Sequence, residues 1–467
     1  MATLPIIPDT ITVHLGAPDD TSARNVTVPF IEYIQNVASS EIYPTWPENA
    51  VRANIYAQIS FALNRIYTEY YRSRGYPFDI TSSTAYDQFF VYDREIFDNI
   101  RNIVNDIFNS YLRRSGNIEP LYAQYCDGIR VQCPGGLSQW GSVDLAQEGY
   151  TPFAILQNYY GDEIELVTDV PIGNIESSTP SYALQLGSTG DDVRILQIRL
   201  NRISNNYPSI PKIVQTDGIF TTDTEAAVLR FQEIFQLTPD GIVGNATWFA
   251  IERIYASVKR LNELYSEGIT LQEVAQQYPG ILQRGSMGMG VRNLQFFLNY
   301  IEPYYNTGIT VDIDGIFGES TENAVLNFQK LMGLSVDGIV GEDTWRALYN
   351  AYRGIVRQIP VRYIDGNTIP FPGSVLRIGS ESEDVRVLQE YLNFISERIP
   401  EVPSLSVTGY FGEQTQAAVQ AVQELYGLDP NGVVGVITWN AITSLYNDLY
   451  QGERLEEGQY PGYEIGS

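Results

Sequence analysis

A hydrophobic pattern with a helical period recurs three times in the second half of the chain. In its first copy, Val193, Leu196, Leu200 and Ile203 are spaced by three, four and three residues, which predicts a helix with one apolar face. The apolar run over 227–235, with Ala227, Leu229, Phe231 and Phe235, predicts a second helix that is buried. Each copy of the pattern therefore indicates helices that pack against one another.

Polar and glycine positions mark where these helices begin and end. Thr222 is followed by Glu225 three residues later, a spacing typical of a capping box, so the second helix is predicted to begin there. A third helix is predicted directly after the motif DGIVG, with Trp248 in its first turn. Glycines between the helices suit tight turns with positive φ; they are Gly218, Gly241 and Gly244. Each copy is predicted to be a small three-helix bundle.

The repeats are separated by distances that favour independent domains. The motif DGIVGNATW begins at residue 240, DGIVGEDTW at 337 and NGVVGVITW at 431, so the offsets are 337 − 240 = 97 and 431 − 337 = 94. Units of a solenoid are shorter, about 20–50 residues. We therefore predict three all-α domains, which cover residues 182–260, 279–356 and 370–450.

The first 165 residues have a different pattern, which predicts an α+β domain over 1–165. Residues 11–16 read as a strand, 79–91 as a strand and turn, and 94–112 as a helix, while 135–167 read as a turn, one helix and a final strand. A long helix is predicted to start at Pro47, a residue tolerated in a first turn. Its apolar face comprises Val51, Ile55, Ile59, Leu63, Ile66 and Tyr70.

The segments between these domains have the composition of linkers. Residues 170–181 and 359–373 are rich in Pro, Gly, Ser and Asn. The connection between the first two repeats, 256–280, has a helical pattern and is expected to be stiff. The last twelve residues, 456–467, are expected to be mobile.

Composition narrows the class of partner. The chain has 467 residues, enough for about three to four domains, and 56 acidic against 29 basic residues give a net charge of −27. Nucleic acids and anionic membranes favour basic surfaces, so neither is expected as a partner. We expect no membrane span, because no window approaches 18 uninterrupted apolar residues. The first residues lack the features of a secretory signal, so synthesis in the cytoplasm without export by that route is expected.

A single histidine, His14, restricts the chemistry. Nucleophile systems of the Ser-His-Asp or Cys-His type would have to use that one residue. Zinc hydrolases usually draw on two or three histidines. Both classes of hydrolase are therefore disfavoured.

The repeats resemble a known family. The run "DGIFG.xT..AV..FQ…GL..DGIVG..TW" is similar to the three-helix peptidoglycan-binding domain found on bacterial and phage wall enzymes. The resemblance implies peptidoglycan as the partner, bound through glycan strands or stem peptides. Candidate contact residues are Asp240, Gly241, Trp248, Asp337, Gly338, Trp345, Gly432 and Trp439.

A structural interpretation of the same positions stands beside this one. The three tryptophans suit the core of each bundle, and the Asp-Gly pairs suit turns. The third repeat departs from the motif, because Asn431 replaces the aspartate and residues 421–423, Ala-Val-Gln, replace the Phe-Gln pair. Its contribution to binding is therefore expected to differ.

The N-terminal region has a resemblance of its own. The order "YI.NV..SE", "DIT.ST.YDQ.F" and "GLSQWG….A..G" is similar to the stage II sporulation protein D and amidase-enhancer family. Members are lytic transglycosylases that cut peptide-free glycan, and the resemblance places the catalytic glutamate at Glu41, in SSEIYP. One carboxyl group with a raised pKa can protonate the glycosidic oxygen and then accept the proton of the attacking 6-hydroxyl. In the alternative interpretation Glu41 is a carboxylate favoured by the dipole of the helix that starts at Pro47.

The same region departs from the family pattern. The segment before GLSQWG is short, and Cys133-Pro134 stands where the family has a histidine. Cys126 and Cys133 supply two ligands, fewer than the usual four of structural zinc, so we expect no metal and no cofactor. A disulfide between them and two reduced thiols both remain open.

Three functional hypotheses follow. The first is a cell-wall or spore-associated protein that binds peptidoglycan and has lytic transglycosylase activity. In the second, the protein is not an enzyme but a structural adaptor that tethers a spore layer or assembly, through spore-layer proteins, to peptidoglycan. The third is a phage-tail or lysis component.

Overall fold

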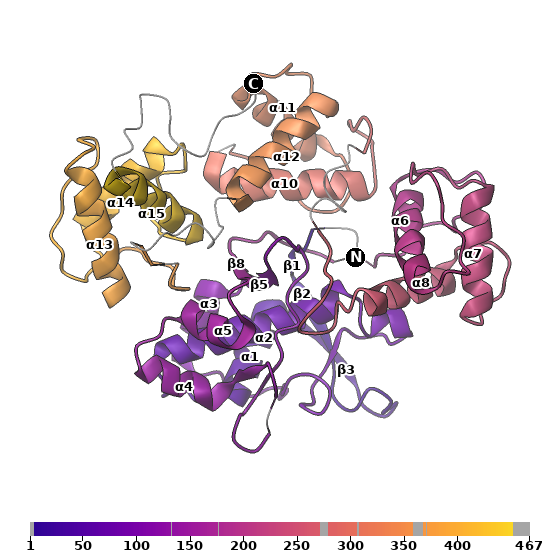
Figure 1. Ribbon diagram of the computed structural model, residues 1–467, viewed down its shortest axis with the longest axis horizontal. Coiled ribbons are helices and arrows are strands. Elements are labelled where there is room, and N and C mark those ends of the chain that lie inside the picture. Colours follow the sequence, from indigo (N-terminus) through magenta and orange to yellow (C-terminus); the bar gives the residue numbers. More distant parts are fainter. Residues whose placement is uncertain are drawn as a thin grey trace.

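The computed structural model describes residues 4–131, 133–175, 177–270, 279–305, 308–357, 368–369 and 371–451. An α+β N-terminal domain is followed by three helical bundles, as the sequence predicts, and Figure 1 shows the bundles arranged around the N-terminal domain. The predicted domain limits remain predictions. In the structure, chain segments from the two sides of these limits pack against each other.

Short strands form the β part of the N-terminal domain. The largest sheet is three-stranded, with β2 (Thr10–His14) between antiparallel β3 (Asn25–Pro29) and parallel β4 (Ile80–Thr81). The other strands pair two by two: β1 (Ile7–Pro8) with β9 (Ile172–Gly173), β5 (Tyr111–Arg114) with β8 (Ile164–Val167), and β6 (Tyr125–Cys126) with β7 (Leu137–Ser138).

Five α-helices and one 3₁₀ turn complete this domain: α1 (Phe30–Glu41), α2 (Glu48–Tyr67), η1 (Arg72–Arg74), α3 (Asp98–Ile107), α4 (Gln139–Gln147) and α5 (Pro152–Tyr160). The predicted helix over 94–112 is too long, since its last residues form β5. The single helix predicted near the end of the domain is also wrong. Gly149, at φ 93°, ends the first of two helices, and the Thr151 side chain caps the second by accepting the Ala154 N–H.

Helix α2 runs through the middle of the N-terminal domain, with its residues buried from Ala50 to Tyr67. The predicted single apolar face is therefore incomplete, because polar residues are buried as well. Their hydrogen bonds reach distant segments: the Asn64 side-chain amide donates to the Pro120 and Leu261 carbonyls at 2.8 and 2.9 Å, and the Tyr56 hydroxyl donates to the Gly373 carbonyl at 2.7 Å. These bonds offset the cost of burying the polar groups.

The three bundles have the same order of elements. They comprise α6 (Asp191–Asn206), α7 (Thr222–Ile234) and α8 (Asn245–Val258); α10 (Met289–Tyr305), α11 (Glu319–Leu331) and α12 (Glu342–Arg357); and α13 (Glu383–Ser396), α14 (Glu413–Leu425) and α15 (Val436–Gln451). The predicted apolar stripe of the first helix is buried. The predicted capping box is absent, because Thr221 is the N-cap of α7 and makes no side-chain capping bond.

A glutamine on one helix holds the next turn in each bundle. The Gln232 amide nitrogen donates to Asp240 Oδ1 and the Ile242 carbonyl at 2.9 and 3.0 Å, and its oxygen accepts the Gly241 N–H at 2.9 Å. Gln197 binds the earlier turn of the same bundle in the same way, through Gly218 N–H and the Ile219 carbonyl. Each of these two turns is therefore held by the side-chain amide of a glutamine in the preceding helix.

The connecting segments differ from the linkers predicted. Residues 170–181 contribute β9 to a strand pair, and the Ser178 N–H and hydroxyl both donate to the Glu69 carboxylate. In the connection 256–280, α8 ends at Val258, the Ile269 N–H donates to Glu119 at 2.8 Å, and residues 271–278 lie outside the described part. Residues 359–367 and the tail 456–467 also lie outside it.

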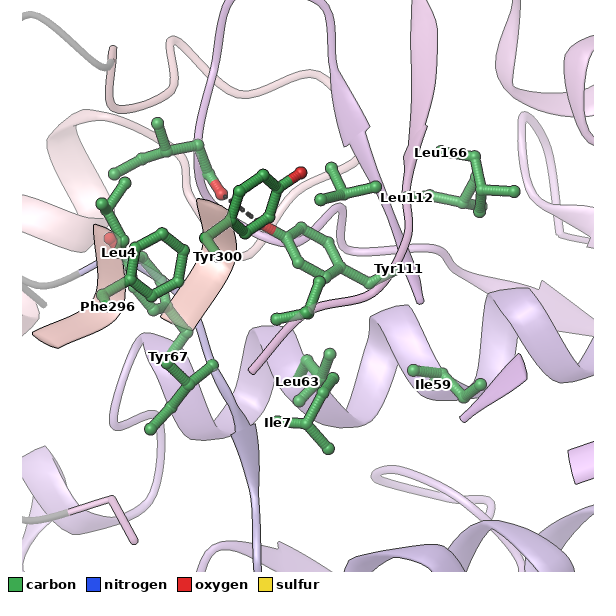
Figure 2. Close-up of a cluster of buried hydrophobic side chains, with 14 of the residues drawn as sticks. Leu4, Ile7, Ile59, Leu63, Tyr67, Tyr111, Leu112, Leu166, Phe296 and Tyr300 are labelled. Carbon is green, nitrogen blue, oxygen red and sulfur yellow. Dashed lines mark hydrogen bonds between the residues drawn. The ribbon is translucent and has the colours of Figure 1, made fainter. Parts of the chain in front are cut away.

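The second bundle packs directly against the N-terminal domain. Figure 2 shows Phe296 and Tyr300 of α10 in one cluster with Tyr111 of β5 and Tyr67 of α2, and all four side chains are buried. Burial of this much aromatic surface stabilises the contact. The N-terminal domain and this bundle therefore share a hydrophobic core.

Candidate functional site

Glu41 is the last residue of α1, and its carboxyl group lies in a set of hydrogen-bond donors. One oxygen accepts the Phe89 backbone N–H at 2.8 Å, and the other accepts the Gln58 side-chain amide at 2.9 Å. The Tyr125 hydroxyl makes a third hydrogen bond to the same carboxyl. Three separate segments of the N-terminal domain therefore converge on this side chain.

A second glutamine extends this network. The Gln88 side-chain amide donates to the Tyr125 hydroxyl and to the Gln58 carbonyl, both at 3.0 Å, and its oxygen accepts the Tyr33 hydroxyl at 2.9 Å. Because the Tyr125 oxygen accepts from Gln88, its own proton is directed to Glu41. The network orients the carboxyl in one position.

Burial raises the pKa of the Glu41 carboxyl to about 7, and hydrogen bonds from Phe89, Tyr125 and Gln58 lower it, with a smaller combined effect. A position at the end of α1 also disfavours an anion, because the C-terminus of a helix carries partial negative charge. A group with a pKa near neutrality can give and take a proton at the same pH. The carboxyl is therefore suited to acid–base chemistry.

The hydrogen bonds of Glu41 do not involve the N-terminus of the helix that the alternative interpretation invoked. That helix, α2, begins at Glu48, whereas the carboxyl is bound by Gln58 from the middle of α2 and by the Phe89 N–H from outside it. Gln58, Gln88 and Tyr125 were not singled out from the sequence. Gln88 stands within the motif DIT.ST.YDQ.F and Gln58 within the predicted long helix, but their burial, which marks them as hydrogen-bonded groups, is visible only in the structure.

Three aromatic side chains form a surface cluster in the same domain, which we name the aromatic ledge: Tyr43, Trp46 and Trp140. Their ring centroids are 5.6 Å apart for Tyr43–Trp46, 5.8 Å for Tyr43–Trp140 and 4.9 Å for Trp46–Trp140. Tyr43 is 57% exposed and Trp140 39%. Tyr43 follows Glu41 by two residues, so the ledge adjoins the carboxyl along the chain. Exposed rings of this kind offer flat apolar surfaces to a ligand.

A disulfide joins Cys126 to Cys133. Its first cysteine follows Tyr125, and both residues belong to β6, which pairs with β7. The disulfide thus closes a loop that begins directly after Tyr125, a hydrogen-bond partner of Glu41. Among the residues that the structure describes, no group of three or more His, Cys, Asp or Glu side chains is arranged to hold a metal ion.

The single histidine lies within the three-stranded sheet. His14 Nδ1 is 2.7 Å from Asn25 Oδ1, Nε2 is 2.9 Å from the Ala17 carbonyl, and the ring stacks on Phe78. Both ring nitrogens are thus engaged with groups of the fold. Its role in this structure is to hold a strand and its loop.

The tryptophans proposed as peptidoglycan contacts are buried. Trp248, Trp345 and Trp439 are 1–3% exposed. Trp248 Nε1 donates to the Ser178 hydroxyl, and Trp439 Nε1 donates to the Ile369 carbonyl, both at 3.0 Å. All three indoles pack inside the bundles, and those of Trp248 and Trp439 also bind the segment that leads into their bundle.

The Asp-Gly positions form turns. Gly241, Gly338 and Gly432 have φ of 74°, 71° and 72°, the left-handed region that favours glycine. Asp240 is exposed, and its carboxylate accepts the Ile242 N–H at 2.9 Å; this bond and the one from Gln232 lower its pKa.

The other two copies of this turn have the same geometry. Asp337 accepts the Ile339 N–H at 2.9 Å, and Asn431 accepts the Val433 N–H at 2.8 Å. Asparagine therefore preserves the turn in the third copy. Gln423 likewise keeps the role of the glutamine there, since its amide donates to the Val433 carbonyl at 3.0 Å.

No helix in the described part of the chain is both long and apolar enough to span a membrane. This finding agrees with the pattern of the sequence.

Comparison with known proteins identifies the bundles. Residues 189–251, 288–348 and 381–442 each match the family described as putative peptidoglycan binding domain. The chain is 34% identical over 164 residues to the N-acetylmuramoyl-L-alanine amidase CwlL of Bacillus licheniformis. This match covers 34% of this chain and 43% of the relative. It is 42% identical over 101 residues to the zinc D-Ala-D-Ala carboxypeptidase of Streptomyces albus G. This match covers 19% of this chain and 38% of the relative.

The matches to both relatives span less than half of the relatives' own length. A solved structure, the SleB N-terminal domain, is 31% identical; the match covers 17% of this chain and 99% of that one, with a TM-score of 0.15. The C-terminal part of the chain contains three tandem domains of the peptidoglycan-binding family, and peptidoglycan is the partner that this family indicates.

Proposed function

We propose that this protein binds peptidoglycan through its three bundles and cleaves the glycan strands with its N-terminal domain, as a lytic transglycosylase. The observation that carries the proposal is the Glu41 carboxyl, whose pKa is raised to about 7 by burial and whose orientation is held by Gln58, Phe89 and Tyr125. The resemblance to the stage II sporulation protein D family supports the same residue.

The proposed reaction uses one carboxyl group in two steps. Protonated Glu41 gives its proton to the glycosidic oxygen as the bond to the anomeric carbon breaks. The resulting carboxylate accepts the proton of the sugar's own 6-hydroxyl, whose oxygen bonds to the same carbon. The products are a 1,6-anhydro end and a free hydroxyl end, and Glu41 is protonated again. No water or second carboxylate takes part, unlike most glycoside hydrolases.

The three bundles would raise the local concentration of substrate. Each domain alone needs only modest affinity, because linked modules on a repetitive polymer gain avidity when they bind together. Relatives named as an amidase and a carboxypeptidase share sequence with this chain, which supports a place at the cell wall. We place the protein in the cell wall or in spore layers, where spore-layer proteins would be neighbours.

Product analysis tests the activity. Wild type and Glu41→Gln are incubated with intact peptidoglycan and with peptide-free glycan, and mass spectrometry detects 1,6-anhydromuramic ends. We expect these ends from wild type alone, with equal pull-down of both proteins on wall material. Products from Glu41→Gln at the wild-type rate would refute the role of Glu41.

A second candidate function, a tether without catalysis, is favoured by one observation. Both oxygens of Glu41 accept hydrogen bonds from the protein, an arrangement that also suits a structural carboxylate. A tether would release no products from either protein, and pull-down would remain intact. Fractionation of spores and vegetative walls tests the location, since absence from spores would contradict spore association.

A further inference from the structure

A polar pocket opens on the N-terminal domain next to the aromatic ledge. Trp46, from the loop between α1 and α2, belongs to both. Arg52 of α2 and three side chains of α3, namely Asn99, Asn102 and Asp106, form most of the remaining wall. The pocket is distinct from the Glu41 network, because none of the carboxyl's hydrogen-bond partners lines it.

The Arg52 side chain is held in a fixed position in the wall of the pocket. The residue is 7% exposed; its Nε donates to Glu48 at 2.7 Å and its Nη2 to Asp106 at 3.2 Å. Its buried Nη1 has no hydrogen-bond partner within the described ranges. Two ion pairs therefore hold a guanidinium whose donors are not all used, an unusual arrangement for a buried group.

The charges around this pocket balance. Arg52 pairs with Glu48 and Asp106, and Asp106 also pairs with Arg377. Two guanidinium groups thus face two carboxylates, which gives no net attraction for an ion. Asn99 and Asn102 are exposed at the rim, and each amide carries donors and an acceptor, although the Asn99 nitrogen already donates to the Pro44 carbonyl at 2.5 Å. This chemistry fits an uncharged ligand with hydroxyl and amide groups, and Trp46 offers such a ligand an apolar surface.

We infer that this pocket is a saccharide subsite, which binds an N-acetylhexosamine of a glycan strand that also crosses the aromatic ledge. The inference rests on the proposed function, since that function supplies the strand. Trp46 lines the pocket and contacts Tyr43 and Trp140, so the ledge and the pocket are continuous, and Glu41 lies five residues before Trp46 in the sequence. Aromatic rings with a few converging polar groups are usual in small-molecule sites.

The third peptidoglycan-binding bundle borders the pocket. Arg377, which pairs with Asp106, lies in the segment that leads into α13. The same segment is fixed to the N-terminal domain by the Tyr56 hydroxyl, which donates to the Gly373 carbonyl, and by the Phe153 N–H, which donates to the Pro372 carbonyl at 3.2 Å. A strand bound by this bundle would lie near the pocket.

Fluorine NMR of the full chain, with 5-fluorotryptophan in place of tryptophan, tests the inference. The chain has five tryptophans, so each domain carries its own resonance, and Trp46→Phe assigns the one that reports on the pocket. The background is Glu41→Gln, which excludes turnover. The probe is chitotetraose, an uncharged oligomer of N-acetylglucosamine. We expect a saturable shift of the Trp46 resonance.

Two substitutions at one exposed position then probe the pocket. Asn102→Ala removes a rim amide and is expected to weaken binding about three- to tenfold, the usual net effect of one hydrogen bond. Asn102→Trp fills the pocket and is expected to abolish the Trp46 shift. Asn105→Ala is the control, because Asn105 is an exposed asparagine of α3 outside the pocket; it removes the acceptor of the Gln35 amide at 2.9 Å but no pocket group, so it should bind as the parent does.

The outcomes separate this inference from the proposed function. An unchanged Trp46 resonance, or equal affinity in the parent and both Asn102 variants, overturns the subsite even if wild type cleaves glycan. A saturable shift that Asn102→Trp abolishes supports the subsite even if no 1,6-anhydro ends form. Shifts confined to Trp248, Trp345 or Trp439 would assign saccharide binding to the bundles and also overturn the subsite.

Discussion

The side-chain amide of Gln58 donates a 2.9 Å hydrogen bond to the Glu41 carboxyl from the centre of α2. Gln58 is fully buried, and its own side-chain oxygen has no hydrogen-bond partner in the described part of the chain. The residue thus gives one donor to Glu41 and leaves one buried acceptor unsatisfied, which costs stability.

Replacement of this donor should raise the pKa of Glu41. Gln58→Leu keeps the volume and removes a hydrogen bond that stabilises the carboxylate, so the pKa should rise from about 7 by about one unit. Carbon-13 NMR of labelled glutamate side chains measures it, and Glu41→Gln assigns the resonance. An unchanged titration in Gln58→Leu would show that the bond does not affect the carboxyl.

Stability should depend on pH through Glu41. The folded state keeps this proton up to about pH 7, whereas an ordinary glutamate loses it near 4.5. Between these values the unfolded state binds fewer protons, so stability falls as pH rises, by up to about 3 kcal/mol. Hydrogen exchange of α2 amides at several pH values, relative to Glu41→Gln, measures the trend. Parallel curves for the two proteins would contradict the raised pKa.

The glutamine that holds the turn of the second bundle should be essential there. Gln329 donates to the Ile339 carbonyl and accepts the Gly338 N–H, both at 2.9 Å. Gln329→Leu leaves the Gly338 N–H without its partner, at a cost of about 1–3 kcal/mol, and leaves the Ile339 carbonyl with the Gly341 N–H alone, at 3.2 Å. We expect faster hydrogen exchange in this bundle, with the other two unaffected. Lys330→Ala, at the exposed neighbouring position, is the control and should exchange as wild type does.

Loss of the disulfide should loosen the loop that directly follows Tyr125. A crosslink between residues seven apart stabilises by about 2.5 kcal/mol in the chain-entropy view. Reduction, or the double change Cys126→Ser and Cys133→Ser, should increase hydrogen exchange in β6 and β7. Reductant should have no further effect on the double variant. Equal exchange in oxidised and reduced wild type would show that the fold holds this loop without the crosslink.

The bundles could be predicted well because their signals are local. Helical spacing, glycine turns and a tryptophan fall in order within each copy, and the same residues meet in space. The sequence also indicated Glu41, but only through resemblance. Its partners come from α2, from the segment after β4 and from β6, and no local spacing predicts that Gln58, Gln88 and Tyr125 converge.

The errors in the N-terminal domain have a similar cause. The apolar pattern of 94–112 continues from α3 into β5, and a buried strand and a buried helix look alike over a few residues. The segment 170–181 has a linker's composition, yet β9 finds its partner, β1, at the other end of the domain. Pairing over such separations depends on tertiary packing, which composition does not report.

The hydrogen bonds that cross the predicted domain limits restrict how this protein can be divided. Asn64 and Tyr56 lie inside α2, and their acceptors are the carbonyls of Leu261 and Gly373. A fragment cut at residue 165 would expose apolar side chains, remove the acceptor of the buried Tyr56 hydroxyl and leave the Asn64 amide with the Pro120 carbonyl alone. We therefore expect that the first 165 residues do not fold independently of the rest of the chain. Transfer of this segment to another wall protein, or its separate expression, would have to include the segments that carry Leu261 and Gly373.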